Sequence, residues 1–262
     1  MSAGARLAAI VLVGFGAALA AAAGGLPGPV SPAADLAGMT ASLPHAIRQR
    51  ILASPKDFLA LARGVLREPA DLFRLVDKRH LLPSDYAPGD LVNLKDYSLP
   101  LYLGSVLVRK EILGPVLEMS KAARREGITL VYSSGYRSFE YQAFVYAREV
   151  KNYGQAAADR ESARPGASQH QLGTAIDFGS ISDSFNQTPA GKWLAAHAWE
   201  YGFSLSYPQG LEDVTGYRYE GWHYRYLTRA GLLLQRAYFD DVQQYMLEFL
   251  DANRRQLESA GP

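Results

Sequence analysis

The spacing of apolar residues predicts helices at both ends of the chain. Residues 46–78 are amphipathic, and Pro55 and Pro69 stand where a proline opens a helix, in its first turn. From Thr228 onward, apolar residues recur every three or four positions, which predicts one long amphipathic helix. Its apolar face is formed by Leu232, Phe239, Val242, Met246 and Phe249. Both ends are therefore expected to be mainly helical.

Between these ends, short strand-like runs alternate with helices. Apolar or aromatic strands are predicted over residues 128–133, 174–178, 203–207 and 217–226. Helices are predicted over residues 109–126, 138–153 and 189–201. Ser138 caps the second of these helices, and Gly202 ends the third. Strands joined by irregular connections, with helices grouped at the sides, favour an α+β fold over a parallel α/β sheet.

The N-terminal region has the pattern of an export signal. Arg6 is the only charge before an apolar run over residues 7–23, which ends in small residues suited to a signal peptidase. The run is 17 residues long and Ala-rich, short for a membrane span of about 20 residues, so an uncleaved anchor is the alternative. Residues 24–44, rich in Gly, Pro, Ala and Ser, read as a linker.

Composition narrows the classes of protein further. Of 262 residues, 48% are hydrophobic and 20% charged, which excludes a disordered or collagenous chain. The formal net charge of +1 gives no basic excess, so no nucleic-acid partner is expected. The chain has no cysteine, and any metal must be held by His, Asp or Glu. An exported chain without cysteine suits a bacterial periplasm or cell envelope.

Two histidines stand out from the rest. The chain has five: His45, His80, His170, His197 and His223. His45 in the linker region and His80 in a basic run are expected to face solvent. His197 has Glu200 one turn further on, an ordinary pair on a helix surface. His170 and His223 remain as candidate metal ligands because of their neighbours.

The neighbours of these two histidines suggest a metal centre. His170 stands in a predicted turn, with Asp177 on the strand that follows, and His223 lies in another predicted strand. Two histidines and a carboxylate are a usual ligand set for zinc with an open fourth position. A nearby Glu220 could then act as the base that deprotonates a bound water.

The spacing of Glu220 and His223 leaves two alternatives. In a regular strand these side chains point to opposite faces, because their separation is odd. Either Gly221 supplies a bulge that brings both toward the metal, or Glu220 precedes the strand and comes from a loop. The sequence alone leaves this choice open.

A third cluster surrounds Arg137. A predicted strand that ends in a glycine turn and a capped helix presents Arg137 at an edge, where its guanidinium could clamp a carboxylate. The alternative is a surface arginine paired with Glu140. Gln142, one turn into the helix, could project in the same direction.

Taken in order, the motifs SSGYRS, SQHQLGTAID and EGWHYRY resemble those of the VanY-type D-alanyl-D-alanine carboxypeptidases, zinc peptidases that share a fold with lysostaphin-like and hedgehog domains. The resemblance covers about residues 81–230. It implies an α+β domain in which a small antiparallel sheet carries the zinc site and helices flank it. Around it we expect a signal or anchor over 1–23, a linker and helical segment over 24–80, and a C-terminal helix over 231–262.

The resemblance also implies roles for single residues. Zinc would be held by His170, Asp177 and His223, with Glu220 as catalytic base and Arg137 gripping the terminal carboxylate of the substrate. Two further residues match positions that line the substrate pocket, Ser168 and Gln142.

The chain departs from the family pattern at two positions. Gln169 stands where the family usually has Glu, and Gly221 where it usually has Pro. Neither is an expected metal ligand, so activity is expected to survive. The change at Gln169 removes a charge near the metal, and Gly221 loosens the chain between base and ligand.

The resemblance implies a zinc carboxypeptidase that removes a C-terminal D-amino acid from peptidoglycan stem peptides, with D,D- or L,D-specificity. A peptidoglycan endopeptidase is a second enzyme alternative. From another class, a non-catalytic zinc domain could bind wall peptides or serve signalling. The presence of Glu220 beside three ligands favours catalysis. Contact with a membrane is expected only through the N-terminal segment.

Overall fold

The structure is a computed structural model that describes Met1 and residues 32–259. Apart from Met1, the predicted signal or anchor over 1–23 lies outside the described residues, as does the first part of the predicted linker. In the part of the chain that is described, no helix has the length and apolar character needed to span a bilayer.

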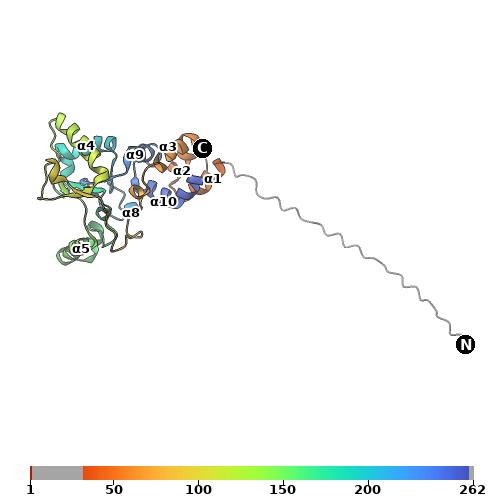
Figure 1. Cartoon of the computed structure of the whole chain (residues 1–262), viewed down its shortest axis with the longest axis horizontal. Coiled ribbons are helices and arrows are strands. Elements are labelled where there is room, and N and C mark those ends of the chain that lie inside the picture. The colour runs from red at the N-terminus through yellow and green to blue at the C-terminus, as the bar shows by residue number, and fades with distance from the viewer. Residues whose placement is uncertain (2–31, 260–262) are drawn as a thin grey trace. The chain divides into compact units, whose positions relative to one another are not determined.

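The first and last helices of the described residues pack together as one cluster (Figure 1). Phe58 lies at the centre of their shared core, with the rings of Tyr238, Phe239 and Phe249 at 5.1, 6.2 and 5.4 Å between centroids. The segments predicted separately at the two ends therefore bury their apolar faces against each other. The helices are α1 (Pro32–Met39), α2 (His45–Ala53), α3 (Pro55–Leu66), α9 (Thr228–Tyr238) and α10 (Gln243–Ser259).

Two sequence predictions about these ends are wrong. Residues of the predicted linker form α1, because Leu36 and Met39 find an apolar partner surface among the other helices. The single long C-terminal helix is broken into α9 and α10 at Asp240 and Asp241, whose φ angles are 53° and 61°. Aspartate tolerates this left-handed conformation better than most residues do, and the break leaves the apolar face continuous.

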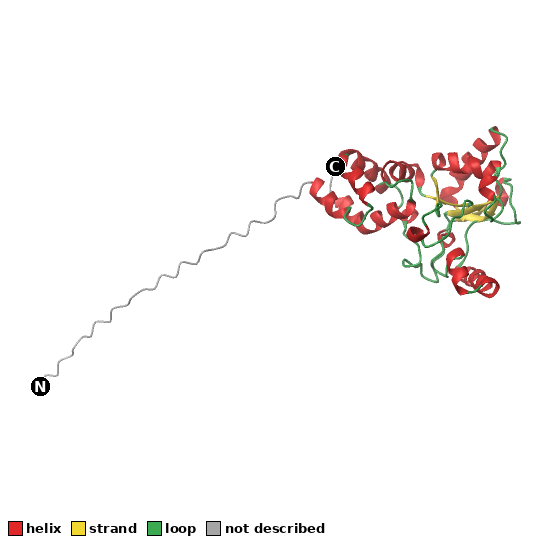
Figure 2. Ribbon diagram, turned by 180° about the vertical axis from the view of Figure 1, so that it is seen from behind, coloured by secondary structure: helices red, strands yellow, loops and turns green. Residues whose placement is uncertain are grey.

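A four-stranded antiparallel sheet forms the other half of the molecule (Figure 2). Its spatial order is β3-β4-β6-β5, and Asp177 stands directly opposite His223 in the central pair. The predicted α+β class is therefore confirmed, although the strands are shorter than predicted. The strands are β3 (Tyr132–Ser134), β4 (Ala175–Phe178), β5 (Phe203–Leu205) and β6 (His223–Tyr226).

The two faces of this sheet have different environments. Ile176, Phe178 and Tyr224 point into a second hydrophobic core, which α4 (Leu113–Arg125) and α7 (Pro189–His197) cover. Because side chains alternate along a strand, Asp177 and His223 point to the opposite face. The sheet thus has one face for packing and one face for polar side chains.

Shorter elements complete the chain. A two-stranded sheet pairs β1 (Leu91–Asn93) with β2 (Leu107–Arg109). Helix α5 (Phe139–Tyr153) packs against α6 (Gln155–Glu161), and Ser138 caps α5 as predicted, its Oγ accepting the N–H of Tyr141 at 3.2 Å. The remaining helical turns are α8 (Glu212–Thr215), η1 (Ala70–Phe73), η2 (Leu94–Tyr97), η3 (Lys110–Ile112), η4 (Gln169–Leu172), η5 (Phe185–Gln187) and η6 (Ala198–Tyr201).

A buried arginine joins the helical cluster to the sheet. Arg225 in β6 is fully buried, and its Nη2 donates to the carbonyl oxygens of Leu72 at 3.0 Å and Arg74 at 2.7 Å. Burial lowers the pKa of Arg225 to about 10, and its guanidinium stays charged at neutral pH. The end of η1 and the residue that follows it are therefore held against the sheet by charge-assisted hydrogen bonds.

Candidate active site

Three segments bring the predicted metal ligands together. His170 lies on η4, where the Oγ of Ser168 accepts the His170 N–H at 3.3 Å. Gly173 ends this turn with a φ of 72°, a conformation that favours glycine, and the chain then enters β4 with Asp177. His223 is supplied by the neighbouring strand β6.

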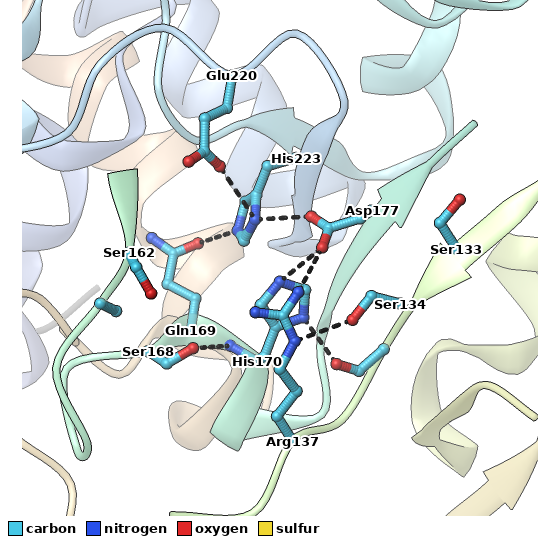
Figure 3. Close-up of polar contacts among 12 residues, drawn as sticks. Ser133, Ser134, Arg137, Ser162, Ser168, Gln169, His170, Asp177, Glu220 and His223 are labelled. Carbon is cyan, nitrogen blue, oxygen red and sulfur yellow. Dashed lines mark hydrogen bonds and ion pairs between the residues drawn. The ribbon is translucent and has the colours of Figure 1, made fainter. Parts of the chain in front are cut away.

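The facing atoms of these three residues form a compact cluster (Figure 3). His170 Nε2 lies 3.1 Å from Asp177 Oδ2, and His223 Nδ1 lies 3.0 Å from Asp177 Oδ1. The ligand atoms all fall within 4.8 Å of one another, and all three residues are buried. The structure therefore brings together the ligand set expected from the sequence.

Hydrogen bonds behind the cluster set which ring nitrogen carries a proton. His170 Nδ1 lies 2.7 Å from the carbonyl oxygen of Gly135, which can only accept, so the N–H is on Nδ1 and the lone pair is on Nε2. His223 Nε2 lies 3.2 Å from Gln169 Oε1, which also accepts the hydroxyl of Ser206 at 2.8 Å. Both histidines therefore turn a lone pair toward Asp177.

This arrangement fits a divalent cation. Asp177 Oδ1 is buried and has no hydrogen bond of suitable geometry from the described residues, although His223 Nδ1 is close. Lone pairs that face one another at such distances repel unless a cation lies between them. Two imidazole nitrogens and a carboxylate are a ligand set that zinc prefers.

The protonation of the cluster agrees with a role as ligands. Burial, together with the charge of Arg137, lowers the pKa of His170 to about 4, so its ring is neutral at pH 7. Burial alone would raise the pKa of Asp177, but the charge of Arg137 beside it helps to hold this pKa well below its usual range. A metal would meet neutral imidazoles and an ionised carboxylate.

Glu220 lies beside the cluster on a turn. Its Oε2 is 3.7 Å from His223 Nδ1, and its backbone carbonyl accepts the N–H of His223 at 3.2 Å. Strand β6 begins only at His223, so the loop alternative is confirmed and no bulge at Gly221 is required. Burial, and then the charge of Asp177, raise the pKa of Glu220 to about 8.

Arg137 reaches into the cluster and does not pair with Glu140. Its Nη2 donates to Asp177 Oδ2 at 2.7 Å and its Nε to Ser134 Oγ at 3.0 Å. The backbone N–H of Arg137 donates to the carbonyl oxygen of His170, which holds this turn against η4. The surface alternative for Arg137 is therefore wrong.

Ser168 and Gln142 line the same cavity as the cluster, which has a volume of about 500 Å³. Gln142 is buried, and its Nε2 donates to the carbonyl oxygen of Ala163 at 2.7 Å. Its Oε1 is buried as well and has no partner among the described residues. A buried acceptor without a donor indicates a place where a ligand could donate a hydrogen bond.

The other histidines lie elsewhere. His197 pairs with Glu200 on the surface at 2.9 Å, as expected, and His45 is exposed. His80 is partly exposed and lies 2.8 Å from Asp77.

Sequence reasoning missed the contact of Gln169 with His223 and the aromatic wall beside it. Tyr207 packs its ring 4.9 Å from the ring of His223, and Tyr217 packs against Tyr207 at the same distance. Both tyrosines line the cavity. The aromatic-rich character of the segments around His223 was the available signal, but it was assigned to strands.

Comparison with known proteins identifies the family. Residues 105–229 match VanY, described as D-alanyl-D-alanine carboxypeptidase. YodJ of Bacillus subtilis (strain 168), named as a carboxypeptidase, is 35% identical over 193 residues, which cover 68% of this chain and 71% of YodJ. The chain belongs to the VanY family. The predicted resemblance and the enzyme class are thereby confirmed.

Further relatives and solved structures support this family assignment. A D-alanyl-D-alanine carboxypeptidase of Enterococcus faecium is 31% identical over 180 residues, which cover 66% of this chain but only 56% of the relative. The solved LdcB LD-carboxypeptidase superposes with a TM-score of 0.62 at 32% identity, over 69% of this chain and 86% of LdcB. A VanY D,D-pentapeptidase solved with Zn(II) gives a TM-score of 0.56 at 26% identity, over 68% of this chain and 99% of the other. The zinc in that relative and the ligand set here confirm zinc as the expected cofactor.

Proposed function

We propose that this protein removes the C-terminal D-amino acid from peptidoglycan stem peptides as a zinc-dependent exopeptidase. The observation that carries the proposal is the convergence of His170, Asp177 and His223 on one face of the sheet, with Glu220 at 3.7 Å from the nearest ligand nitrogen. Support also comes from relatives named as D-alanyl-D-alanine carboxypeptidases and from LdcB, an LD-carboxypeptidase.

His170 Nε2, His223 Nδ1 and the Asp177 carboxylate would hold the metal. When bound, zinc supplies Lewis acidity toward the scissile carbonyl and lowers the pKa of a water molecule. The carbonyl of Gly135 and the amide oxygen of Gln169 keep the two rings in the orientation that this requires.

Glu220 moves the proton. Its carboxylate accepts a proton from the attacking water and returns it to the leaving amine of the released amino acid. Without metal, burial raises the pKa of Glu220 to about 8. A bound divalent cation beside it would lower this pKa again and leave the carboxylate ionised, so that it can accept a proton near neutral pH.

Arg137 recognises the free end of the substrate. A guanidinium has five N–H donors, and Ser134 and Asp177 engage two of them here. The other donors suit a bidentate bond to the terminal carboxylate of the substrate. Recognition of a free carboxylate makes the reaction that of an exopeptidase, which disfavours the endopeptidase alternative.

The direct test uses defined stem peptides. We expect the purified zinc-loaded chain to shorten a tetrapeptide or a pentapeptide stem by one residue, measured by mass spectrometry, and to leave a C-terminally amidated stem intact. Shortening of the tetrapeptide would assign L,D-specificity, and shortening of the pentapeptide would assign D,D-specificity. Zinc binding without cleavage of either stem would favour the non-catalytic binding domain.

We also propose that the enzyme acts outside the cytoplasm, in the periplasm or cell envelope. The apolar run over residues 7–23 supports this location, and the proposed substrate lies there. Fractionation of producing cells, followed by determination of the N-terminal residue, separates a cleaved signal from a retained anchor. Enzyme found only in the cytoplasm with its N-terminus intact would contradict the proposal.

A further inference from the structure

A lysine outside the cavity joins two elements of the cavity wall. The Nζ of Lys78 donates to the carbonyl oxygen of Asp159 on α6 at 2.6 Å, and to the carbonyl oxygen of Gly216 at the end of α8. The same Nζ lies 4.6 Å from the ring centroid of Tyr217, a distance at which a cation and an aromatic ring attract each other. One ammonium group therefore contacts α6, the end of α8 and an aromatic ring.

The groups that Lys78 contacts lead to the metal cluster. Tyr217 is buried, lines the cavity and packs on Tyr207. Tyr207 in turn packs on His223, with ring centroids 4.9 Å apart. Glu161, the last residue of α6, lines the same cavity. A change at Lys78 would therefore reach the aromatic wall, Tyr207 and Tyr217, that lies beside a metal ligand.

The backbone at Gly216 leaves room for the lysine. Its φ of 80° is a conformation that favours glycine. A Cβ at this position would lie 3.2 Å from Cδ and 3.4 Å from Cε of Lys78, so a side chain there would press against the lysine stem. The stem therefore packs on bare backbone, directly before Tyr217.

The turn that carries Lys78 is fixed to the helical cluster. Asp77 is buried, and its Oδ1 accepts the backbone N–H groups of Arg79 at 2.7 Å and of His80 at 2.9 Å. Its Oδ2 accepts a hydrogen bond from Nε2 of Gln244 on α10 at 2.9 Å. A residue that positions a site needs support of this kind from its neighbours.

We infer that Lys78 is a positioning residue for the aromatic wall. It clamps α6 to the end of α8 and holds the ring of Tyr217 against Tyr207, so that the wall stays in place when a substrate binds. Because Lys78 does not line the cavity, it acts through these rings and not by contact with the substrate. The effect on turnover rests on the proposed function, whereas the clamp itself does not.

The kinetic test is Lys78→Met in the full zinc-loaded chain. Methionine keeps a flexible apolar stem but has no charge and no donor. We expect KM for the stem peptide that the parent cleaves to rise about fivefold, the size of effect that loss of one cation–π contact produces. We expect kcat and zinc content to stay within twofold of the parent, because a wall that contacts ground state and transition state alike changes KM alone.

The ion pair of Arg160 and Glu212 offers a matched control. It also joins α6 to α8, with Arg160 Nη2 2.8 Å from Glu212 Oε2, but neither residue lines the cavity. An exposed ion pair of this kind contributes little. Arg160→Met is therefore expected to leave both KM and kcat within twofold of the parent.

Chemical rescue separates positioning from a general structural role. The chain has no cysteine, so Lys78→Cys carries a single thiol. Alkylation with 2-bromoethylamine rebuilds an ammonium group at the length of the lysine side chain, and alkylation with 1-iodopropane gives a neutral side chain of the same length. We expect the first adduct to return KM to within twofold of the parent and the second to keep it about fivefold raised. Equal KM values for the two adducts would overturn the inference.

A measurement of hydrogen exchange makes the result independent of turnover. The backbone N–H of Arg218 donates to the carbonyl oxygen of Arg160 at 3.1 Å, between the two elements that Lys78 clamps. We expect this amide to exchange about fivefold faster in Lys78→Met than in the parent, because exchange follows local opening. If the parent cleaves stems while KM and exchange are unchanged in Lys78→Met, the inference is overturned and the proposed function stands. If the parent binds zinc but cleaves no stem, the proposed function fails, and the exchange rates decide the clamp by themselves.

Discussion

At the scale of single residues, the site depends on a few hydrogen bonds that fix protons and orientations. Gly135 and Gln169 each hold one histidine ring, and Ser134 holds Arg137 against Asp177. Each of these contacts predicts the outcome of a substitution.

Glu220→Gln is expected to abolish turnover while keeping fold and zinc. Glutamine is nearly isosteric but cannot accept the proton of water at neutral pH, so a general-base contribution of about 10²–10⁴-fold should be lost. Zinc content, thermal unfolding and kcat measured on the same preparations check this result. Turnover near the rate of the parent would show that another group is the base.

The same variant should change how stability depends on pH. Because burial raises the pKa of Glu220 from its ordinary value of 4.5 to about 8, the folded chain binds a proton that the unfolded chain releases. This contribution to stability is complete below pH 4.5 and is lost as pH rises toward 8. In chelator, Glu220→Gln should therefore gain stability relative to the parent across this range, measured by urea unfolding. If the free energies of unfolding of the two proteins changed with pH in the same way, the raised pKa of Glu220 would be contradicted.

Arg137→Lys is not expected to be a conservative change. Lysine keeps the charge but loses the planar fork that engages Ser134, Asp177 and a carboxylate together. Truncating one side of such a pair costs about 2–5 kcal/mol, so kcat/KM should fall tenfold or more. A loss on free-acid stems, combined with no activity of either protein on amidated stems, supports the carboxylate role. A variant within twofold of the parent contradicts it.

Gln169 is expected to control zinc affinity. Gln169→Ala removes the acceptor behind His223 Nε2 and also leaves the hydroxyl of Ser206 without its partner. Loss of an orienting contact behind a metal ligand weakens binding about 10–100-fold. Gln169→Glu, which restores the usual residue of the family, keeps an acceptor there and is the matched control. Competition with a chromophoric chelator measures the zinc affinity of both variants. A zinc affinity of Gln169→Ala equal to that of the parent would contradict this role.

At the scale of elements, the start of α5 positions both Arg137 and Gln142. Ser138 caps this helix through its Oγ, and Arg137 immediately precedes the cap. The cavity-lining face of α5 then follows from the helical repeat. A weakened start of α5 should therefore disturb the site as well as the helix.

Ser138→Ala is expected to lower the free energy of unfolding by about 1 kcal/mol, the usual cost of a lost N-cap. We also expect a lower kcat/KM, because Arg137 precedes the cap, Gln142 follows it by four residues, and both line the cavity. Ser54→Ala is the matched control, since Ser54 precedes α3 but its side chain makes no capping hydrogen bond. Urea unfolding and stem-peptide kinetics on the two variants check the prediction, and equal effects would contradict it.

At the scale of the whole molecule, Arg225 joins the sheet to the end of η1, whose Leu72 belongs to the core of the helical cluster. The cluster buries the two ends of the described chain in one core around Phe58. The site on the sheet therefore depends on residues far from it in space and in sequence.

Phe58→Ala is expected to destabilise the whole molecule by about 3–5 kcal/mol, the cost of emptying a core aromatic site. Trp193 and Trp222 lie in the second core, whereas Trp199 packs against the first. In a Trp199→Phe background, tryptophan fluorescence therefore reports on the sheet, while far-UV circular dichroism reports mainly on helices. The two signals should show one coincident urea transition at a lower midpoint. Separate transitions would show that the helical cluster unfolds independently.

Much of this molecule follows from local sequence. The Ser138 cap, the stop at Gly202 and the strand that carries Asp177 depend on residues close together in the chain. The motifs also singled out His170 and His223 among the five histidines, because each sits among residues suited to a turn or a buried strand. Local propensity and residue chemistry act over a few positions, and one sequence is sufficient to detect them.

The remaining features of the fold and of the site were decided by tertiary contacts. The antiparallel register of β4 and β6 places Asp177 opposite His223, and the turn before β6 brings Glu220 to the same side. Residues 32–39 became a helix, and the C-terminal helix broke at Asp240, because distant apolar faces had to meet. The amide of Gln169 came behind His223, 54 positions away in the chain. Strand pairing and core packing join residues far apart in sequence, so their outcome depends on the whole fold and leaves no local signal.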